Sequence, residues 1–159
     1  MNDISTLLST FYTAFQQRDY ASMIACYHPD IHFFDPVFTN LQGKRAGAMW
    51  HMLCERGTDL QATFSDIQAD DKKGQAHWEA TYSFGKNGRL IHNIIDATYT
   101  FQDGKIVRHQ DSFDLWKWTR MALGTKGVLM GWSGVVQGKV RETAVSSLNK
   151  FITAHPEYQ

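Results

Sequence analysis

The sequence predicts an α+β fold in which N-terminal helices pack against a curved, cone-shaped antiparallel sheet. Two observations support this prediction. Apolar residues recur at helical spacing near the N-terminus, whereas residues 60–113 are mostly alternating and contain the hairpin dipeptides Asn87-Gly88 and Asp103-Gly104. Helices followed by consecutive hairpins are typical of α+β domains and not of parallel α/β sheets. A sheet that curves over helices leaves a one-ended apolar cavity, the usual place for small-molecule chemistry.

Three helices and one short strand are expected in the first third of the chain. The first helix covers residues 3–19. Residues 20–27 predict a second, short helix that Pro29 closes, because proline cannot continue a helix. Residues 31–34 predict a strand, and residues 46–56 predict the third helix. The apolar stripe of the first helix consists of Leu7, Leu8, Phe11 and Phe15.

The strands of the sheet are expected over residues 60–69, 75–84, 90–101 and 105–113. The alternation is clearest in the second of these, where Trp78, Ala80, Tyr82 and Phe84 share one face.

The C-terminal part of the chain, residues 115–159, is rich in tryptophan and glycine at its start. Within it, residues 135–152 predict a final helix with a mostly polar surface. We expect one domain over residues 1–159, with residues 115–159 as an extension of it.

Composition excludes several classes of protein. The chain has 43% hydrophobic residues, enough for a core, and a formal net charge of +0, so no basic surplus indicates a nucleic-acid partner. No apolar run is long enough to span a membrane, and the N-terminus lacks the features of a signal peptide. Cys26 and Cys54 are expected to be buried thiols in a reducing compartment. These features favour a cytoplasmic protein without a membrane partner.

Asp35 is the first candidate for chemistry. It lies between the apolar segments 31–34 and 36–38. Such surroundings desolvate a carboxylate, raise its pKa and suit it to work as a general base. The alternative is structural: an aspartate that starts a turn and accepts hydrogen bonds from backbone N–H groups.

His109 and Asp111 form the second candidate pair. In a strand they share one face with Val107 and Phe113. An imidazole beside a carboxylate can move protons near neutral pH. The alternative is a salt-bridged pair on a half-exposed strand.

No cofactor or metal site is expected. The seven histidines show no tight ligand spacing, and the chain contains no glycine-rich phosphate loop and no nucleophile motif of the GxSxG type. The aromatic residues Trp50, Trp78, Tyr82, Phe84 and Tyr99 are expected to face the interior, either as a packed core or as the wall of a cavity.

The order of these motifs resembles a known family. FYTAFQQRDYASMIACYHPDIHFFDPVF, HWEATYSFGKNGRLIHN and IIDATYTFQDGKIVRHQDSFD are similar to SnoaL-like and ketosteroid isomerase-like proteins of the nuclear transport factor 2-like superfamily. The resemblance covers roughly residues 4–116. It implies a cone-shaped α+β barrel, usually a homodimer. It also implies cofactor-free proton transfer, cyclisation, epoxide hydrolysis or dehydration on apolar small molecules, although many members only bind ligands or partners.

The resemblance assigns roles residue by residue. Asp35 matches the general base of the isomerases, which also precedes a proline. The tyrosine of the isomerase oxyanion hole corresponds to Phe11. Its aspartate corresponds to Asp96 when counted from the turn glycine, or to Ala97 when counted from two other anchors, and we favour Ala97. The chain is therefore not expected to be a ketosteroid isomerase proper. The pair of His109 and Asp111 is closer to the polyketide cyclases.

These arguments combine into one expected site. Asp35, His109 and Asp111 are the expected catalytic residues, acting on a small apolar carbonyl compound by general acid–base chemistry. A protein that binds a hydrophobic ligand without turnover, and an interaction module with a filled core, are the alternatives. The residues expected to contact the substrate are Phe11, Phe15, Trp50, Trp78, Tyr82, Asn93, Tyr99 and Phe113.

Overall fold

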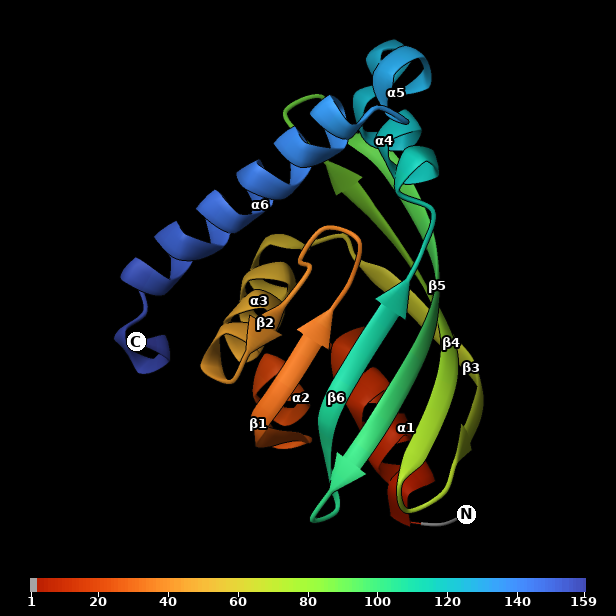
Figure 1. Ribbon diagram of the computed structural model, residues 1–159, viewed down its shortest axis with the longest axis vertical. Coiled ribbons are helices and arrows are strands. Elements are labelled where there is room, and N and C mark those ends of the chain that lie inside the picture. The colour runs from red at the N-terminus through yellow and green to blue at the C-terminus, as the bar shows by residue number, and fades with distance from the viewer. Residues whose placement is uncertain (1–2) are drawn as a thin grey trace.

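The computed structural model describes residues 3–159, and its strands form one curved, open sheet with helices on its inner face (Figure 1). The helices are α1 (Asp3–Gln16), α2 (Tyr20–Ala25), α3 (Lys44–Arg56), α4 (Leu115–Leu123), α5 (Thr125–Met130) and α6 (Gly134–Thr153), followed by the 3-10 helix η1 (Pro156–Tyr158). The strands are β1 (Tyr27–Phe34), β2 (Leu41–Gln42), β3 (Gln61–Ala69), β4 (Lys73–Phe84), β5 (Arg89–Gln102) and β6 (Lys105–Ser112). In this part of the chain, no helix is both long and apolar enough to cross a bilayer.

The strand order is β2-β1-β6-β5-β4-β3, which confirms the expected α+β fold. Strands β3 to β6 form an antiparallel meander, as the hairpin signals predicted. The pairing of β1 with β6 is parallel, so the sheet is not antiparallel throughout. At the β5–β6 turn, Asp103 and Gly104 both have positive φ values, 53° and 73°, as a type I′ hairpin turn requires.

The main core lies between the sheet and helices α1 and α3. Phe11 of α1 and Trp50 of α3 are almost completely buried against Trp78 and Ala97 of the central strands. Burial of large aromatic side chains stabilises the fold by roughly 1.5–3 kcal/mol for each ring the size of phenylalanine.

Residue Tyr27 belongs to a strand and not to the second helix, which corrects the expectation for residues 20–27. Helix α2 ends at Ala25, and Tyr27 begins β1. Pro29 therefore lies inside a strand. It is tolerated because β1 pairs with β6 at Tyr27 and again from His32, with a register shift between them.

A β-bulge in β6 changes which side chains face the core. The β5–β6 register shifts between Thr100 and Phe101, and Ile106 is completely buried whereas Val107 is only half-buried. Ile106, which a regular alternation would place on the opposite face from His109, therefore also points into the core, because the bulge inserts one extra residue between them.

The C-terminal extension contains two helices, α4 and α5, that the sequence did not predict, in addition to the expected final helix. Helix α4 packs on β5 and forms a second apolar cluster around Ile91, Leu115 and Trp118. Helix α6 then runs back across the molecule toward α3 (Figure 1). Its Arg141 donates a hydrogen bond of 2.8 Å to the carbonyl oxygen of Pro36, which fixes the extension to the loop that follows β1.

Candidate functional site

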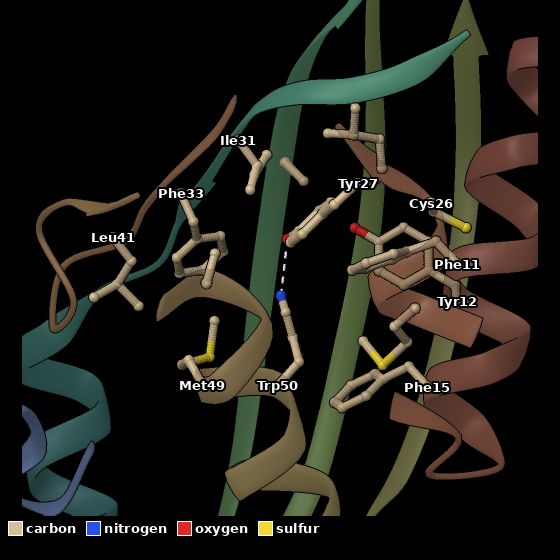
Figure 2. Close-up of a cluster of buried hydrophobic side chains, with 14 of the residues drawn as sticks. Phe11, Tyr12, Phe15, Cys26, Tyr27, Ile31, Phe33, Leu41, Met49 and Trp50 are labelled. Carbon is tan, nitrogen blue, oxygen red and sulfur yellow. Dashed lines mark hydrogen bonds between the residues drawn. The ribbon is translucent and has the colours of Figure 1, made fainter. Parts of the chain in front are cut away.

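A chain of hydrogen bonds between side chains crosses the buried core. Trp50 donates its indole N–H to the hydroxyl oxygen of Tyr27 at 2.8 Å, the contact drawn as a dashed line in Figure 2. The Tyr27 hydroxyl lies 2.8 Å from Nδ1 of His109, and Nε2 of His109 lies 2.9 Å from Oδ1 of Asp111. Trp78 donates to the same Asp111 oxygen at 3.1 Å. The polar side-chain groups of this hydrogen-bond network therefore have partners inside the apolar core.

The protonation state of Tyr27 decides which group donates each hydrogen bond in this network. Burial raises the pKa of Tyr27 well above its ordinary value, so the phenol keeps its proton. Its oxygen already accepts the Trp50 N–H, and its O–H is free to donate to Nδ1 of His109. A neutral imidazole that accepts at Nδ1 carries its proton on Nε2 and donates it to Asp111.

Two further tyrosines pair beside this chain. The hydroxyls of Tyr12 and Tyr99 form a short hydrogen bond in the core. Burial raises the pKa of both, and the negative charge of Asp111 adds to the effect. Both therefore remain neutral and serve as hydrogen-bonding groups rather than as bases.

The carboxyl group of Asp35 begins the loop after β1. Its Oδ1 accepts hydrogen bonds from the backbone N–H groups of Val37 at 2.7 Å and Phe38 at 2.6 Å, which is the turn-forming role that the sequence allowed. Burial nevertheless raises its pKa to about 7, against the lowering effect of these two bonds, and the charge of Asp111 contributes to the rise. Asp35 is thus both a turn residue and a carboxyl group poised to titrate near neutral pH.

Asp35 and Asp111 meet at an open hollow of about 410 Å³ at the end of β1 and β6. His109 is completely buried behind Asp111 and does not reach the hollow itself. The structure therefore brings the three residues expected to be catalytic into one neighbourhood, with Asp35 half-buried, Asp111 buried at the base of the hollow and the imidazole behind it. The residues that line the hollow are Phe34, Asp35, Pro36, Thr39, Arg108, Gln110, Asp111, Ser112 and Phe113.

Most of the aromatic residues expected to contact a substrate lie in packed contacts with one another. Trp50 touches Phe11, Phe15 and Trp78 with ring centroids 5.2–6.2 Å apart. These rings, and also Tyr99, fill the space between helices and sheet, and none of them lines the hollow beside Asp35. Of the residues expected to contact a substrate, Phe113 is the one that lines it.

Two other expected contact residues, Tyr82 and Asn93, lie on the neighbouring strands β4 and β5. The Tyr82 hydroxyl accepts a hydrogen bond of 2.9 Å from the indole of Trp118. Burial raises the pKa of Tyr82, and the charge of Asp35 raises it further. Asn93 is half-buried on the inner face of β5, between Ile91 and Ile95.

The central strand presents Ala97, not Asp96, to the core. Ala97 is buried, whereas the Asp96 side chain is 82% exposed and bonds to Nδ1 of His77 on the outer face. Phe11 and Ala97 occupy the positions that match the tyrosine and the aspartate of the isomerase oxyanion hole, so neither polar donor is present at these positions. Tyr12 and Tyr99 nevertheless bring hydroxyl groups into the same core.

Sequence reasoning missed Tyr27 and Tyr12 as parts of this polar network. Tyr27 was assigned to a helix, and Tyr12 follows Phe11, the residue that matched the tyrosine of the isomerases. Among the described residues, the group of metal-ligating side chains that converges is His51, Glu55 and His155, and none of them lines the hollow.

The comparisons with known proteins agree with this fold. The model of the SnoaL-like domain matches residues 8–109. Among solved structures, an epoxide hydrolase of M. tuberculosis described as LEH-like superposes with a TM-score of 0.64 at 17% identity, covering 80% of this chain and 92% of that one. A putative polyketide cyclase of Xanthomonas campestris superposes with a TM-score of 0.62 at 20% identity, covering 75% and 96%.

A third structure, TerC co-crystallised with polyporic acid, has a TM-score of 0.64 at 16% identity and covers 76% of this chain and 98% of that one. No curated protein sequence matched the chain. At these identities the structures establish the fold and not the reaction. The family match extends over well more than half of the sequence, and on that ground the chain belongs to the SnoaL-like family.

Proposed function

We propose that this protein is an enzyme that transfers protons on a small apolar carbonyl compound, using Asp35 and Asp111 at the hollow beside β6. The observation that carries the proposal is the meeting of two carboxyl groups at one opening, one with a pKa of about 7 and the other backed by a buried imidazole. A general base works best when its pKa is near the operating pH. The proposed chemistry requires no cofactor.

Each residue has a defined part in the proposed reaction. Asp35, ionised in about half of the molecules near pH 7, takes a proton from the carbon next to the substrate carbonyl. The protonated Asp35 then returns this proton to the substrate, so the reaction needs no further acid. Asp111, held by His109 and Trp78, borders the same hollow. Phe34 and Phe113 supply apolar contact surface for the rest of the molecule.

A second candidate is a protein that binds an apolar ligand without turnover. It is favoured by the dense packing of the aromatic core around Trp50, Phe11 and Phe15. In this core the imidazole of His109 has no contact with solvent. Under this alternative, Asp35 serves only to form its turn.

Hydrogen exchange at carbon distinguishes the two candidates without knowledge of the natural product. A panel of small apolar ketones and aldehydes is incubated with the protein in D2O, and loss of the α-proton signal is followed by NMR. We expect catalysed exchange for at least one ketone and a loss of roughly 100-fold or more in Asp35→Asn, which keeps the oxygen that forms the turn.

The matched control is Asp71→Asn, at an exposed aspartate far along the sequence from the hollow. It should exchange at the wild-type rate. Ligand binding without any exchange supports the second candidate. Exchange at the wild-type rate in Asp35→Asn contradicts the proposed role of this carboxyl group.

A further inference from the structure

Three side chains that ligate metals in other proteins converge where the C-terminus meets α3. His51 and Glu55 lie one helical turn apart, and Nε2 of His51 is 3.3 Å from a carboxylate oxygen of Glu55. His155 joins them from the segment before η1, and one ligand atom from each of the three residues lies within 4.8 Å of the others. Ligands bound tetrahedrally at about 2.0–2.1 Å from zinc are about 3.4 Å apart, so small side-chain rotations are enough to close this group on an ion.

Both imidazoles have a second hydrogen-bonding partner of the kind that orients metal ligands. Nδ1 of His155 is 2.7 Å from the carbonyl oxygen of Phe151, which can only accept, so this nitrogen carries the proton and Nε2 keeps its lone pair. Nδ1 of His51 is 2.8 Å from the hydroxyl of Tyr158, and Tyr20 stacks on the ring with centroids 3.6 Å apart. Such outer contacts fix the tautomer and the ring orientation of metal-binding histidines.

We propose that His51, Glu55 and His155 bind a divalent transition metal ion of the zinc class and thereby fasten the C-terminal residues to α3. Two imidazoles and one carboxylate are a donor set that suits Zn²⁺, with a fourth position left for water. The ion would add a further link between the helix and a segment that aromatic contacts and the His51–Tyr158 hydrogen bond already hold.

The test is calorimetric titration of Zn²⁺ into the full chain, without a polyhistidine tag and after removal of metal by a chelator. We expect one ion per chain and a higher Tm in its presence. Glu55→Gln and His155→Gln should each weaken binding by at least 10-fold. Glu55 is exposed, so its replacement leaves the fold intact.

The control is His92→Gln, because His92 and His77 flank Glu79 on the outer face of the sheet, where two histidines also meet a carboxylate. This variant should bind like the wild type. The proposal is overturned if the wild type binds no Zn²⁺, if both site variants bind as tightly as the wild type, or if binding is lost in His92→Gln instead.

An independent observation concerns the surface of the C-terminal extension. Large apolar side chains around α5 point into solvent, with Leu129 and Trp132 each 65% exposed and Val135 81% exposed. Figure 1 shows α5 at the outermost end of the molecule. We call this surface the apolar tip, and its members are Val128, Leu129, Met130, Trp132 and Val135.

The charge around the apolar tip is one-sided. Residues 115–141 contain five basic residues and neither aspartate nor glutamate, although the whole chain has a net charge of +0. Lys117, Lys126 and Lys139 of this segment are exposed. Two copies of such a surface would repel each other in a symmetric contact, which argues against self-association through the tip.

We infer that the apolar tip binds the surface of an anionic lipid bilayer. Tryptophan and aliphatic side chains insert at the boundary of headgroups and acyl chains, and lysines beside them are attracted to anionic lipids. The tip would carry the enzyme to the membranes where apolar substrates concentrate. The inference about the surface does not depend on the proposed reaction.

Sedimentation with vesicles tests this inference. We expect the chain to bind vesicles of phosphatidylcholine mixed with phosphatidylserine several-fold more than vesicles of phosphatidylcholine alone, and to dissociate at high salt. The double variant Leu129→Ser with Trp132→Ser should lose most of this binding. Leu53→Ser, at an exposed leucine on α3, is the control and should bind normally.

Absence of binding to anionic vesicles, or unchanged binding by the double variant, overturns the inference. So does light scattering that shows a wild-type dimer and a monomeric double variant, because the tip is then an interface between two copies of the chain.

Discussion

The indole N–H of Trp78 and the carboxylate of Asp111 are joined by a hydrogen bond of 3.1 Å across the inner face of the sheet. The same carboxylate oxygen lies 2.9 Å from Nε2 of His109, so it has two hydrogen-bonding partners. The Asp111 residue is almost completely buried. Trp78 therefore positions Asp111 at the base of the hollow, and its contribution should be visible in the stability of the fold.

Replacing Trp78 by phenylalanine removes this donor and keeps an aromatic ring. A buried hydrogen bond to a charged group contributes about 2 kcal/mol, and one between neutral groups about 1 kcal/mol. Trp50→Phe is the matched control, because Trp50 donates to the neutral hydroxyl of Tyr27 and loses the same ring volume. We expect urea unfolding at pH 7 to show the larger loss for Trp78→Phe. Equal losses in the two variants would contradict a special role for the Trp78 bond.

The pKa of Asp35 predicts how stability depends on pH. Because the folded value of about 7 lies above the unfolded value, the folded state binds more protons between about pH 4 and pH 7. Wild-type stability contributed by this group is therefore lost as the pH rises through that window. Asp35→Asn, which does not ionise, should become more stable than the wild type by on the order of 1–3 kcal/mol at pH 8, with little difference at pH 4.

Urea unfolding of the wild type, Asp35→Asn and the exposed-site variant Asp71→Asn at both pH values measures this effect. A difference between wild type and Asp35→Asn that is the same at pH 4 and pH 8 would exclude a raised pKa at Asp35.

His77, on the outer face of the sheet, should show a pH dependence in the same direction, because its pKa is also raised in the folded state. Hydrogen bonds to Asp96 and then to Glu79 raise the pKa of His77, so the folded state favours its charged form. The stability that this group contributes is present below its unfolded pKa and disappears as the pH rises through the folded value. His77→Gln should therefore lower the urea midpoint more at pH 5.5 than at pH 8.5.

The control for this prediction is His32→Gln, since His32 stacks on the ring of Phe34 instead of bonding to two carboxylates. The prediction is wrong if His77→Gln shifts the midpoint equally at the two pH values.

The strand pattern of the sequence was enough to predict which face His109 and Asp111 occupy, because a period of two fixes the face of each side chain once the pairing is known. His109 and Asp111 face inward as expected, and the choice between Asp96 and Ala97 followed from the same rule. The pattern did not predict the inward direction of Ile106, because a bulge inserts one residue before Arg108 and no local signal indicates it.

The buried hydrogen-bond chain depends on contacts that no short stretch of sequence contains. Tyr27 and His109 are 82 residues apart, and Tyr12 and Tyr99 are 87 apart. The helices of the extension were missed for a related reason: Gly124, with a φ of 61°, separates two short helices whose packing on each other is a tertiary effect.

The extension also provides the sharpest test of packing, at two glycines that differ only in their surroundings. A Cβ atom on Gly127 would overlap the backbone carbonyl of Thr119, because α4 and α5 approach each other backbone to backbone at this point. A Cβ atom on Gly138, in α6, would meet no atom within 4 Å.

Gly127→Ala should therefore destabilise the protein by roughly 1–3 kcal/mol. Gly138→Ala should stabilise it by about 0.5–1 kcal/mol, because alanine loses less backbone entropy in a helix. Thermal unfolding of the two variants beside the wild type measures both changes. If both variants shift Tm in the same direction by the same amount, the close contact between α4 and α5 does not exist in solution, and the extension does not hold the compact arrangement that places Trp118 against Tyr82.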